Sequence, residues 1–408
     1  MSKEIRLITL DPPYSKYFRH LVKNLEGSEQ VGFKKHYVSA LGYLAFGVKD
    51  STLIKTKIVN RQPSFSSRKT VVGVAKELGY ELNAKSLHRS AQYVEWLKEE
   101  IVQNRINTCL LYNATRFNHA LAITLFQQMG VSYYVFERGT QRGKTTTLLS
   151  NPLLASLPNL NKSLHSHHID AKHYGTESLS DYVLFFFFLM FDGLGRLLRL
   201  NFESPDKALR KKRYSKIFFQ WMKAKRSPDP QLNGKYLLVP LQLEYDSQVR
   251  CFSDFSSTQE FINTVELGFY RSSLKDEYVL VFTTHPFECN KHSFDVRSQC
   301  FSGKTGVLME DASAIVTINS TAGFEAIEKL KPCFVFGEAL YKDKSVVIPT
   351  TTATFTDNLE LWKQNGWQPL RQSVERMKFN ILASTQVQGS VYKYDAEALE
   401  LAKRKIVS

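Results

Sequence analysis

Short apolar runs alternate with amphipathic stretches over the first third of the chain. Three runs have the length and composition of buried strands, at residues 5–10, 108–113 and 131–136. The stretches 17–25 and 117–129 instead place apolar residues three and four positions apart, which is the spacing of one helix face. Gly130 follows the second stretch and is a typical helix stop signal. Strand, helix and strand in this order predict a parallel sheet with helical crossovers.

A second alternating block begins at residue 236. Its predicted strands are residues 236–241, 278–283, 304–309, 314–318 and 333–336. Helical patterns at 256–274 and 322–330 separate several of these strands. Because each strand is short and rich in β-branched or aromatic residues, the block indicates a second Rossmann-like unit.

The region between the two blocks has a different character. It is first polar, then rich in phenylalanine and then basic, and it closes with Ser227-Pro228-Asp229-Pro230. We interpret it as a helical, basic connecting region that ends in a linker. The expected domains are therefore 1–150, 151–233 and 234–408. The expected fold class is α/β, with two Rossmann-like domains that face each other across a cleft, as in many nucleotide-sugar transferases.

The most apolar window of the chain covers residues 183–191, with phenylalanine at four consecutive positions. A membrane-spanning helix needs about 20 apolar residues, and Asp192 and Arg196 soon follow, so the window predicts a buried helix. A segment that dips into one membrane face is the alternative. Basic residues follow the window at Lys207, Arg210, Lys211, Lys212, Arg213, Lys216, Lys223, Lys225 and Arg226.

Composition is that of a soluble globular protein, because 43% of the 408 residues are hydrophobic and 23% are charged. The net charge of +15 indicates an anionic partner, either a nucleotide, a nucleic acid or an acidic lipid surface. Five cysteines without regular spacing argue against a disulfide scaffold and favour a reducing compartment. The first residues lack the apolar core of a secretory signal, so we expect a cytoplasmic protein.

The strongest local motif covers residues 318–326, Ile-Asn-Ser-Thr-Ala-Gly-Phe-Glu-Ala. A strand is expected to end here and a helix to begin, and backbone N–H groups at a helix start bind phosphate well. Ser320 and Thr321 would add hydroxyl donors, Gly323 would leave room for a ligand or a neighbouring strand, and Glu325 could accept hydrogen bonds from ribose. The alternative is an N-capping serine on a close-packed helix.

Three further candidates follow predicted strands. His285, followed by Pro286, could donate a hydrogen bond to phosphate, although a lone histidine in a loop is more often a capping residue. Asp246, in the loop 240–248, could act as a nucleophile at an anomeric carbon, or it could make an Asx-turn. Glu137 could take a proton from an acceptor hydroxyl, or it could form a surface salt bridge.

Several other motifs do not carry a function. Residues 139–145 are one residue short of a phosphate-binding P-loop, with Arg138 where the first glycine is needed. The histidines near residues 165–173 lack ligands at metal-site spacing, and no D-x-D motif is present to hold a divalent cation. Nucleic-acid binding would rest on net charge alone. We therefore expect no metal cofactor and no nucleic-acid partner.

The C-terminal half resembles the capsule polysaccharide synthesis proteins of the KpsS and KpsC type, with the shorter KpsS type the nearer. These are bacterial transferases of 3-deoxy-D-manno-oct-2-ulosonic acid (Kdo). The resemblance is clear over about residues 236–392. The matching segments are Leu241-Gln242, Asp246-Ser247-Gln248-Val249-Arg250, His285-Pro286, residues 316–323, Lys331-Pro332, Gly337, Ala339-Leu340-Tyr341 and Thr385-Gln386-Val387.

This resemblance implies a GT-B-like fold, CMP-Kdo as the donor and a retaining, metal-independent transfer to a phosphatidylglycerol-type lipid or a glycolipid. By analogy, Asp246 is the catalytic carboxylate and Glu137 matches the first acid of an E-E-G or E-D-G motif. The implied nucleotide-sugar-binding residues are Gln242, Ser247, Gln248, His285, Pro286, Asn319, Ser320, Thr321, Gly323 and Glu325. Arg138 and Thr283 depart from the family pattern, which leaves the acceptor and the base open.

The resemblance and the charge together predict a peripheral enzyme on the cytoplasmic face of the inner membrane. An anionic lipid or glycolipid acceptor would contact the basic residues, each of which contributes about 1 kcal/mol near an acidic leaflet. Other capsule assembly proteins are possible partners. Two alternatives stay open: a transferase of another CMP-sugar, such as a sialic acid, and a capsule assembly or export partner without catalytic activity.

Overall fold

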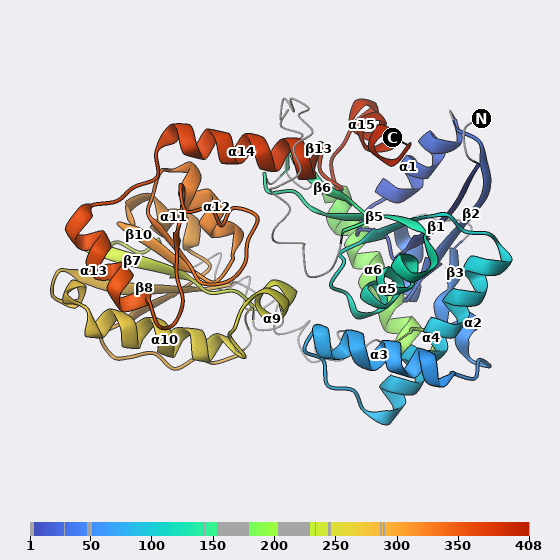
Figure 1. Ribbon diagram of the computed structural model, residues 1–408, viewed down its shortest axis with the longest axis horizontal. Helices are drawn as coiled ribbons and strands as arrows, with labels where there is room; N and C mark the ends of the chain where they lie inside the picture. The colour runs from blue at the N-terminus through green and yellow to red at the C-terminus, as the bar shows by residue number, and fades with distance from the viewer. Residues whose placement is uncertain are drawn as a thin grey trace. The chain divides into compact units, whose positions relative to one another are not determined.

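A computed structural model describes residues 4–27, 29–46, 51–141, 143–152, 179–202, 229–232, 234–243, 246–285, 288 and 290–407. The described residues form two compact units, each built around one β-sheet (Figure 1). Unit 1 contains residues 4–152, 179–202 and 382–407, and unit 2 contains residues 229–381. Residues 382–407, which are the last 26 described residues, belong to unit 1. The C-terminal unit therefore ends at 381 rather than at the predicted 408.

Unit 1 has a seven-stranded sheet of order β13-β6-β5-β4-β1-β2-β3. Its strands are β1 (Ile5–Leu10), β2 (Val31–Val38), β3 (Ser51–Leu53), β4 (Thr108–Tyr112), β5 (Ser132–Arg138), β6 (Thr145–Ser150) and β13 (Gln386–Gln388). The five strands from β3 to β5 pair in parallel, whereas β6 pairs antiparallel with both β5 and β13. The predicted parallel sheet is confirmed, and the antiparallel edge is an addition to it.

The helical elements of unit 1 are α1 (Tyr17–Glu26), η1 (Leu41–Phe46), α2 (Ile54–Ile58), α3 (Phe65–Glu77), α4 (Ala84–Gln103), α5 (Phe117–Met129), α6 (Leu179–Leu197) and α15 (Ala396–Val407). α5 has the predicted bounds, and Gly130 ends it in a left-handed conformation with φ 68°. A side chain at this φ would be strained, which is why glycine stops the helix here.

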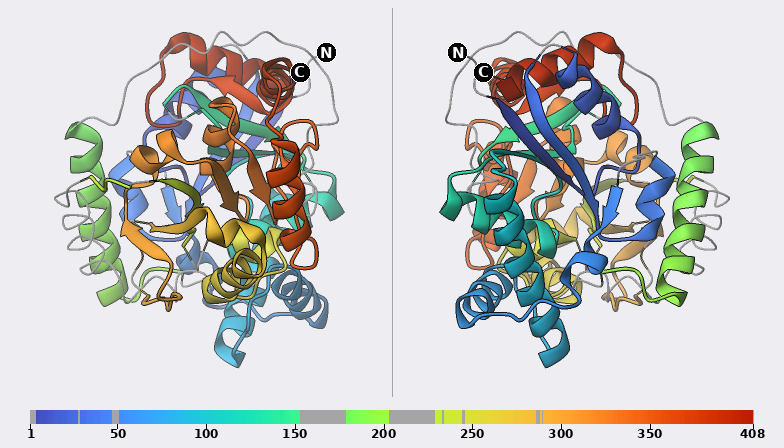
Figure 2. Two further views of the ribbon diagram at one scale, coloured as in Figure 1. Left: turned by 90° about the vertical axis from the view of Figure 1, so that its left-hand side faces the viewer. Right: turned by 90° about the vertical axis from the view of Figure 1, so that its right-hand side faces the viewer.

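Helix α6 forms where the apolar window predicted a buried helix, but only one of its faces is buried. Phe188 is 5% exposed and packs against Tyr43 and Phe46 of η1. Phe186, in contrast, is 63% exposed. The exposed residues Val183, Phe186, Phe187, Met190, Leu194, Leu197 and Leu198 recur at helical spacing, and we name them the apolar stripe. Both views of Figure 2 place α6 on the outside of unit 1, so the predicted burial holds for one face of the helix only.

Unit 2 has a six-stranded parallel sheet of order β12-β11-β10-β7-β8-β9. Its strands are β7 (Lys235–Pro240), β8 (Tyr278–Thr284), β9 (Gln299–Ser302), β10 (Ala314–Thr317), β11 (Cys333–Val335) and β12 (Ile348–Pro349). Its helical elements are α9 (Ser247–Phe252), α10 (Thr258–Arg271), η3 (Ser273–Asp276), α11 (Thr305–Asp311), α12 (Thr321–Glu328), α13 (Phe355–Asn365) and most of α14 (Arg371–Thr385).

Two hydrophobic clusters cover the faces of this sheet. α10 and α13 contribute to one cluster, and α11, α12 and α14 contribute to the other. The parallel sheet with helices on both faces is a Rossmann-like arrangement. With its counterpart in unit 1, it confirms the predicted α/β fold class.

One predicted strand is wrong. Residues 304–309 are not a strand, because α11 occupies them and β9 lies just before. Leu308 and Met309 are both buried although they are adjacent, which a helix packed on the sheet permits and the alternating faces of a strand do not. Of the connecting region, α6 is helical as predicted, while residues 153–178 and 203–228 lie outside the described residues.

Candidate functional site

Three neighbouring parallel strands of unit 2 end at the same edge of its sheet. β10, β7 and β8 lie in this order, and Asn319, Gln242 and His285 each follow one of them within two residues. Adjacent strands are about 4.8 Å apart, so the loops after β8 and β10 begin about 10 Å from each other. Open α/β sheets bind ligands at this carboxyl edge. The topology therefore places the sequence-predicted residues Asn319, Gln242 and His285 at one edge of the sheet.

Asn319 is the centre of the hydrogen bonds at this edge, and it is 7% exposed. Its Oδ1 accepts a 2.9 Å hydrogen bond from Gln242 Nε2, and its backbone N–H donates to Gln242 Oε1 at 3.3 Å. Asn319 Nδ2 donates to the carbonyl oxygens of Gln248 (2.9 Å) and Phe252 (3.3 Å). Gln242 and Asn319 thus hold α9 against the end of β10.

Ser320 caps α12 and lies at its first turn. Its Oγ accepts a hydrogen bond from Ala322 N at 3.2 Å, as the capping alternative predicted. A hydroxyl that accepts one hydrogen bond keeps a proton to donate, so capping and phosphate binding are compatible. Thr321 is exposed beside it.

Gly323 is buried, and the structure shows why no side chain stands there. A Cβ at this position would lie 2.5 Å from Tyr341 Oη and 3.1 Å from Thr317 Cγ2 of β10. Tyr341 also donates a 2.5 Å hydrogen bond to the carbonyl of Ser320. Gly323 therefore leaves room for the neighbouring Tyr341 side chain and for β10. Glu325, two residues further along α12, is exposed.

Asp246 is the N-cap of α9. Its Oδ1 accepts a hydrogen bond from Gln248 N at 3.0 Å, and its backbone N–H donates to the carbonyl of Leu243 at 2.8 Å. These bonds fix the carboxylate in one orientation at the same edge as Asn319. A carboxylate held in this way is suited to a single geometry of attack or charge stabilisation.

His285 is exposed at the end of β8, and its carbonyl accepts from Glu288 N at 2.8 Å. An exposed imidazole at a carboxyl edge can reach a phosphate. Pro286 lies outside the described residues, and the side chain of Ser247 is not among those described.

Glu137 belongs to unit 1, at the end of β5. Its Oε1 accepts a hydrogen bond from Ala114 N at 3.3 Å, and Glu137 is half-buried. The neighbouring Arg138 is exposed and lies over the ring of Tyr392, with 5.1 Å between Cζ and the ring centroid. The aromatic contact gives Arg138 a structural partner at the position where the family pattern has a second acid.

A polar cluster at the carboxyl edge of unit 1 was not predicted from the sequence. Asp11 follows β1 and is fully buried, and its carboxylate accepts from Ser39 N at 2.6 Å, from Ser39 Oγ at 2.5 Å and from Asn118 Nδ2 at 3.4 Å. His119 Nε2 lies 3.7 Å from Asp11 Oδ2. β1 and β4 are adjacent here, which is the switch point of the sheet. The sequence signal was Asp11-Pro12-Pro13 directly after a strand.

Arg116 is the cation of this cluster and is 7% exposed. It donates to Tyr43 Oη at 2.8 Å and lies over the rings of Tyr14 and Tyr112. Burial works to lower the pKa of its guanidinium, but the neighbouring Tyr43, Tyr14 and Asp11 groups outweigh it and raise the pKa. Arg116 therefore stays charged inside the unit.

Comparison with known proteins places the C-terminal half in context. Residues 207–392 match the family described as capsule polysaccharide biosynthesis protein. The capsule polysaccharide export protein KpsS of Escherichia coli is 30% identical over 176 residues, which are 40% of this chain and 43% of that protein. The chain thus aligns with less than half of that relative. The resemblance predicted from the motifs of residues 236–392 is confirmed.

Two further similarities extend over more of the chain. The capsule polysaccharide modification protein LipB of Neisseria meningitidis serogroup A is 22% identical over 336 residues, covering 74% of this chain and 78% of LipB. Among solved structures, the β-Kdo 2,7 transferase KpsC of Thermosulfurimonas dismutans aligns with 98% of this chain and 99% of its own, at 12% identity and a TM-score of 0.41.

Proposed function

We propose that this chain is a glycosyltransferase of capsule polysaccharide biosynthesis that transfers Kdo from CMP-Kdo to an anionic lipid or glycolipid. The sequence similarity of residues 207–392 supports the capsule pathway. The donor and the acceptor are what the resemblance to the KpsS- and KpsC-type proteins implies.

The observation that carries the proposal is the convergence at the edge of unit 2. Asp246, Ser320 and His285 lie in the loops after β7, β10 and β8, which are three adjacent strands. They provide a fixed carboxylate, a hydroxyl at a helix start and an exposed imidazole. A phosphate next to a reacting sugar carbon needs these three groups: two donors for the phosphate and one carboxylate for the carbon.

In the proposed reaction, the donor phosphate accepts hydrogen bonds from Ser320, Thr321 and His285, and Glu325 accepts from the ribose hydroxyls. Asp246 attacks the anomeric carbon of Kdo, the bond from this carbon to the phosphate oxygen breaks, and CMP leaves with the electron pair. A general base then takes the proton of the acceptor hydroxyl, whose oxygen attacks the same carbon and releases Asp246. Two displacements at one carbon give retention, and the steps use no metal.

The acceptor is proposed to lie at an acidic membrane surface. Among the described residues, no helix is both long and apolar enough to cross a membrane. The net charge of +15 and the apolar stripe of α6 support peripheral binding, since an interfacial helix combines apolar and cationic contacts. We propose attachment to the cytoplasmic face of the inner membrane, where other capsule assembly proteins are possible partners.

The test is CMP release from CMP-Kdo in the presence of phosphatidylglycerol vesicles. We expect Asp246→Asn to lower kcat on the order of a thousandfold, while His285→Ala weakens CMP binding roughly 10- to 100-fold through loss of a charge-assisted hydrogen bond. Asp254→Asn is the matched control, because Asp254 is an exposed carboxylate of the same unit. Wild-type turnover in both site variants would reject this site.

The alternatives from the sequence are separated by the same assay. A transferase of another CMP-sugar would release CMP from CMP-sialic acid instead of CMP-Kdo. An assembly or export partner without catalysis would release CMP from neither. The fixed Asp246 carboxylate favours an enzyme, since glycolipid binding alone needs no carboxylate beside the proposed phosphate site.

A further inference from the structure

Unit 1 contains a pocket that the proposed donor site does not use. It has a volume of about 510 Å³, within the range of roughly 300–1,000 Å³ typical of small-molecule sites. The described residues that line it are Lys55, Ile58, Val59, Ala84, Lys85, His88, Arg89, Gln92, Asn201 and Phe202. This lining contains three permanent cations, one histidine and no carboxylate.

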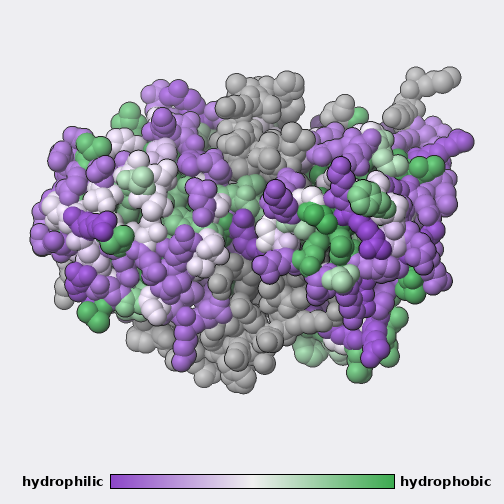
Figure 3. All heavy atoms as spheres, turned by 60° about the horizontal axis from the view of Figure 1, so that its bottom comes forward, coloured by the Kyte–Doolittle hydropathy of each residue, from purple (hydrophilic) through white to green (hydrophobic). Residues whose placement is uncertain are grey.

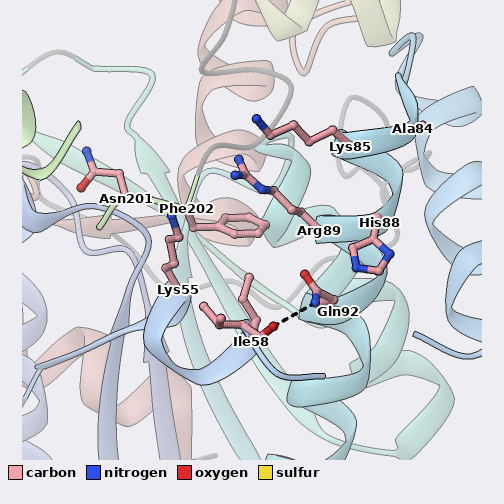
Figure 4. Close-up of a pocket in the computed structure, with 10 residues that line it drawn as sticks. Lys55, Ile58, Ala84, Lys85, His88, Arg89, Gln92, Asn201 and Phe202 are labelled. Carbon is pink, nitrogen blue, oxygen red and sulfur yellow. Dashed lines mark hydrogen bonds between the residues drawn. The ribbon is translucent and has the colours of Figure 1, made fainter. Parts of the chain in front are cut away.

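The cationic side of the pocket comes from the start of α4. Lys85, His88 and Arg89 lie one helical turn or less apart, and within the described residues none of them has an ion pair or a hydrogen-bond partner for its side chain. Figure 4 shows Lys85 and Arg89 extending from α4 toward the ring of Phe202. Cations that face a common space without a counter-charge repel one another, so an anion placed between them is stabilised.

Several lining residues of the pocket are held in place by contacts within unit 1. Phe202 is 2% exposed, packs on Tyr93 at 5.5 Å between ring centroids and donates its backbone N–H to Ser39 at 2.7 Å. Gln92 Nε2 donates to the carbonyls of Val59 (3.3 Å) and Arg61 (2.9 Å), which ties α4 to the end of α2. Lys55 donates to the carbonyl of Arg199. These contacts hold the lining residues in place, so the pocket is preformed.

The pocket lining includes residues that closely follow the apolar stripe of α6 in the chain. Leu197 and Leu198 are 79% and 54% exposed, and Asn201 and Phe202 of the pocket follow within five residues. Figure 3 shows one face of the molecule, on which hydrophilic side chains surround small hydrophobic groups. An exposed apolar helix followed in the chain by a cationic pocket, whose described lining has no carboxylate, matches the two parts of an anionic phospholipid, which are its acyl chains and its phosphate.

We propose that this pocket binds the phosphate headgroup of an anionic phospholipid while the apolar stripe contacts the acyl region. Arg89 provides a planar fork that suits phosphate oxygens, and Lys85 adds a second charge. This inference rests on the membrane association in the proposed function but uses none of the donor-site residues. If the protein binds CMP but not the lipid, the pocket alone is rejected. If it binds the lipid but not CMP, the donor site alone is rejected.

The first test compares two double variants of equal charge. Lys85→Gln/Arg89→Gln removes the pocket cations, and Arg68→Gln/Lys69→Gln removes two exposed cations of α3 outside the pocket. Binding is measured by flotation with vesicles of phosphatidylcholine containing phosphatidylglycerol, and with phosphatidylcholine alone. We expect the pocket pair to lose about tenfold more affinity than the control pair, because hydrogen bonds to phosphate add to general attraction. Equal losses would overturn the proposal.

The second test separates a lipid headgroup from free phosphate. Calorimetry with soluble dihexanoyl phosphatidylglycerol should show saturable binding that dihexanoyl phosphatidylcholine does not reproduce. Val59→Asp places a carboxylate at the pocket and should abolish this binding, whereas Val72→Asp, at an exposed position of α3, should not. Binding of inorganic phosphate as tight as that of the anionic lipid would contradict a lipid site, as would binding that survives Val59→Asp.

Discussion

The side-chain amide of Gln242 lies 2.9 Å from Asn319 Oδ1, and this hydrogen bond joins the loop after β7 to the loop after β10. Seventy-seven residues separate the two amino acids in the chain. The contact holds α9, and with it the capping Asp246, against the start of α12. The relative position of the proposed nucleophile and the proposed phosphate site thus depends on two amides, of which Asn319 is buried and Gln242 is half-buried.

Removing either amide should therefore affect the site and the stability together. We expect Asn319→Ala to destabilise unit 2 by about 1–3 kcal/mol, because buried donors and acceptors lose their partners. Gln242→Ala should cost less, since Gln242 is only half-buried. Urea unfolding of the two single variants and the double variant gives the coupling energy, which we expect at about 0.5–3 kcal/mol. Additive effects would show that the two amides do not act as a pair.

Gly323 provides a second test, with a control on another helix. Gly323→Ala should destabilise by about 1–3 kcal/mol, because the added methyl group meets Tyr341 Oη. Tyr341→Phe should restore part of this loss, since it removes the nearest atom. Gly73→Ala on α3 meets no atom within 4 Å and should raise stability by roughly 0.5–1 kcal/mol. Thermal unfolding compares the variants; a neutral Gly323→Ala would contradict the packing described for this turn.

The two faces of α6 predict opposite phenotypes. Phe188→Ala should destabilise unit 1 by about 3–5 kcal/mol, because Phe188 fills the core next to Tyr43. Phe186→Ala, on the apolar stripe, should leave stability within about 0.5 kcal/mol and weaken vesicle binding. Circular dichroism melting and vesicle flotation separate the two effects. A stripe variant that binds vesicles like the wild type would remove α6 from the membrane contact.

Lys405 predicts how the stability of unit 1 depends on pH. Burial lowers the pKa of Lys405 from 10.5 to about 8. Between these two values the unfolded chain binds more protons than the folded one, so stability should rise with pH from about 8 to 10.5 and reach its maximum above. The rise is about 1–3 kcal/mol.

The variant Lys405→Met should remove this rise, whereas Lys69→Met, at an exposed lysine of α3, should keep it. Urea midpoints measured across this pH window give the comparison. A wild-type profile that is flat from pH 8 to 10.5 would show that the Lys405 ammonium keeps its hydration in the fold.

Signals from adjacent residues were sufficient to predict many elements. Features that depend on long-range contacts could not be predicted from the sequence. The bounds of β1 and α5 follow from apolar runs and from Gly130, which are features of adjacent residues. The β-branched Val307 favours a strand at 304–309, yet Val307 is exposed and Leu308 packs as part of a helix. At this segment, packing against the sheet outweighs strand propensity.

In the candidate site, too, local motifs were predictable and long-range contacts were not. Sequence motifs located Asp246, His285 and Ser320 at strand ends, and the sheet order brings these ends to one edge. The role of Gly323 was not predictable, because it depends on Tyr341, eighteen residues away in the chain. Nor could an apolar window show that α6 has one face in the core and one in solvent. The buried cluster around Asp11 required the pairing of β1 with β4.

The most direct test of the central claim is a crystal structure of the chain with CMP bound. We predict that phosphate oxygens lie within about 3 Å of donors from Ser320 or Thr321 and from His285, with the ribose next to Glu325 and the Asp246 carboxylate across the sugar position from the phosphate. CMP bound away from the carboxyl edge of unit 2, or with its phosphate out of reach of both α12 and His285, would contradict the account.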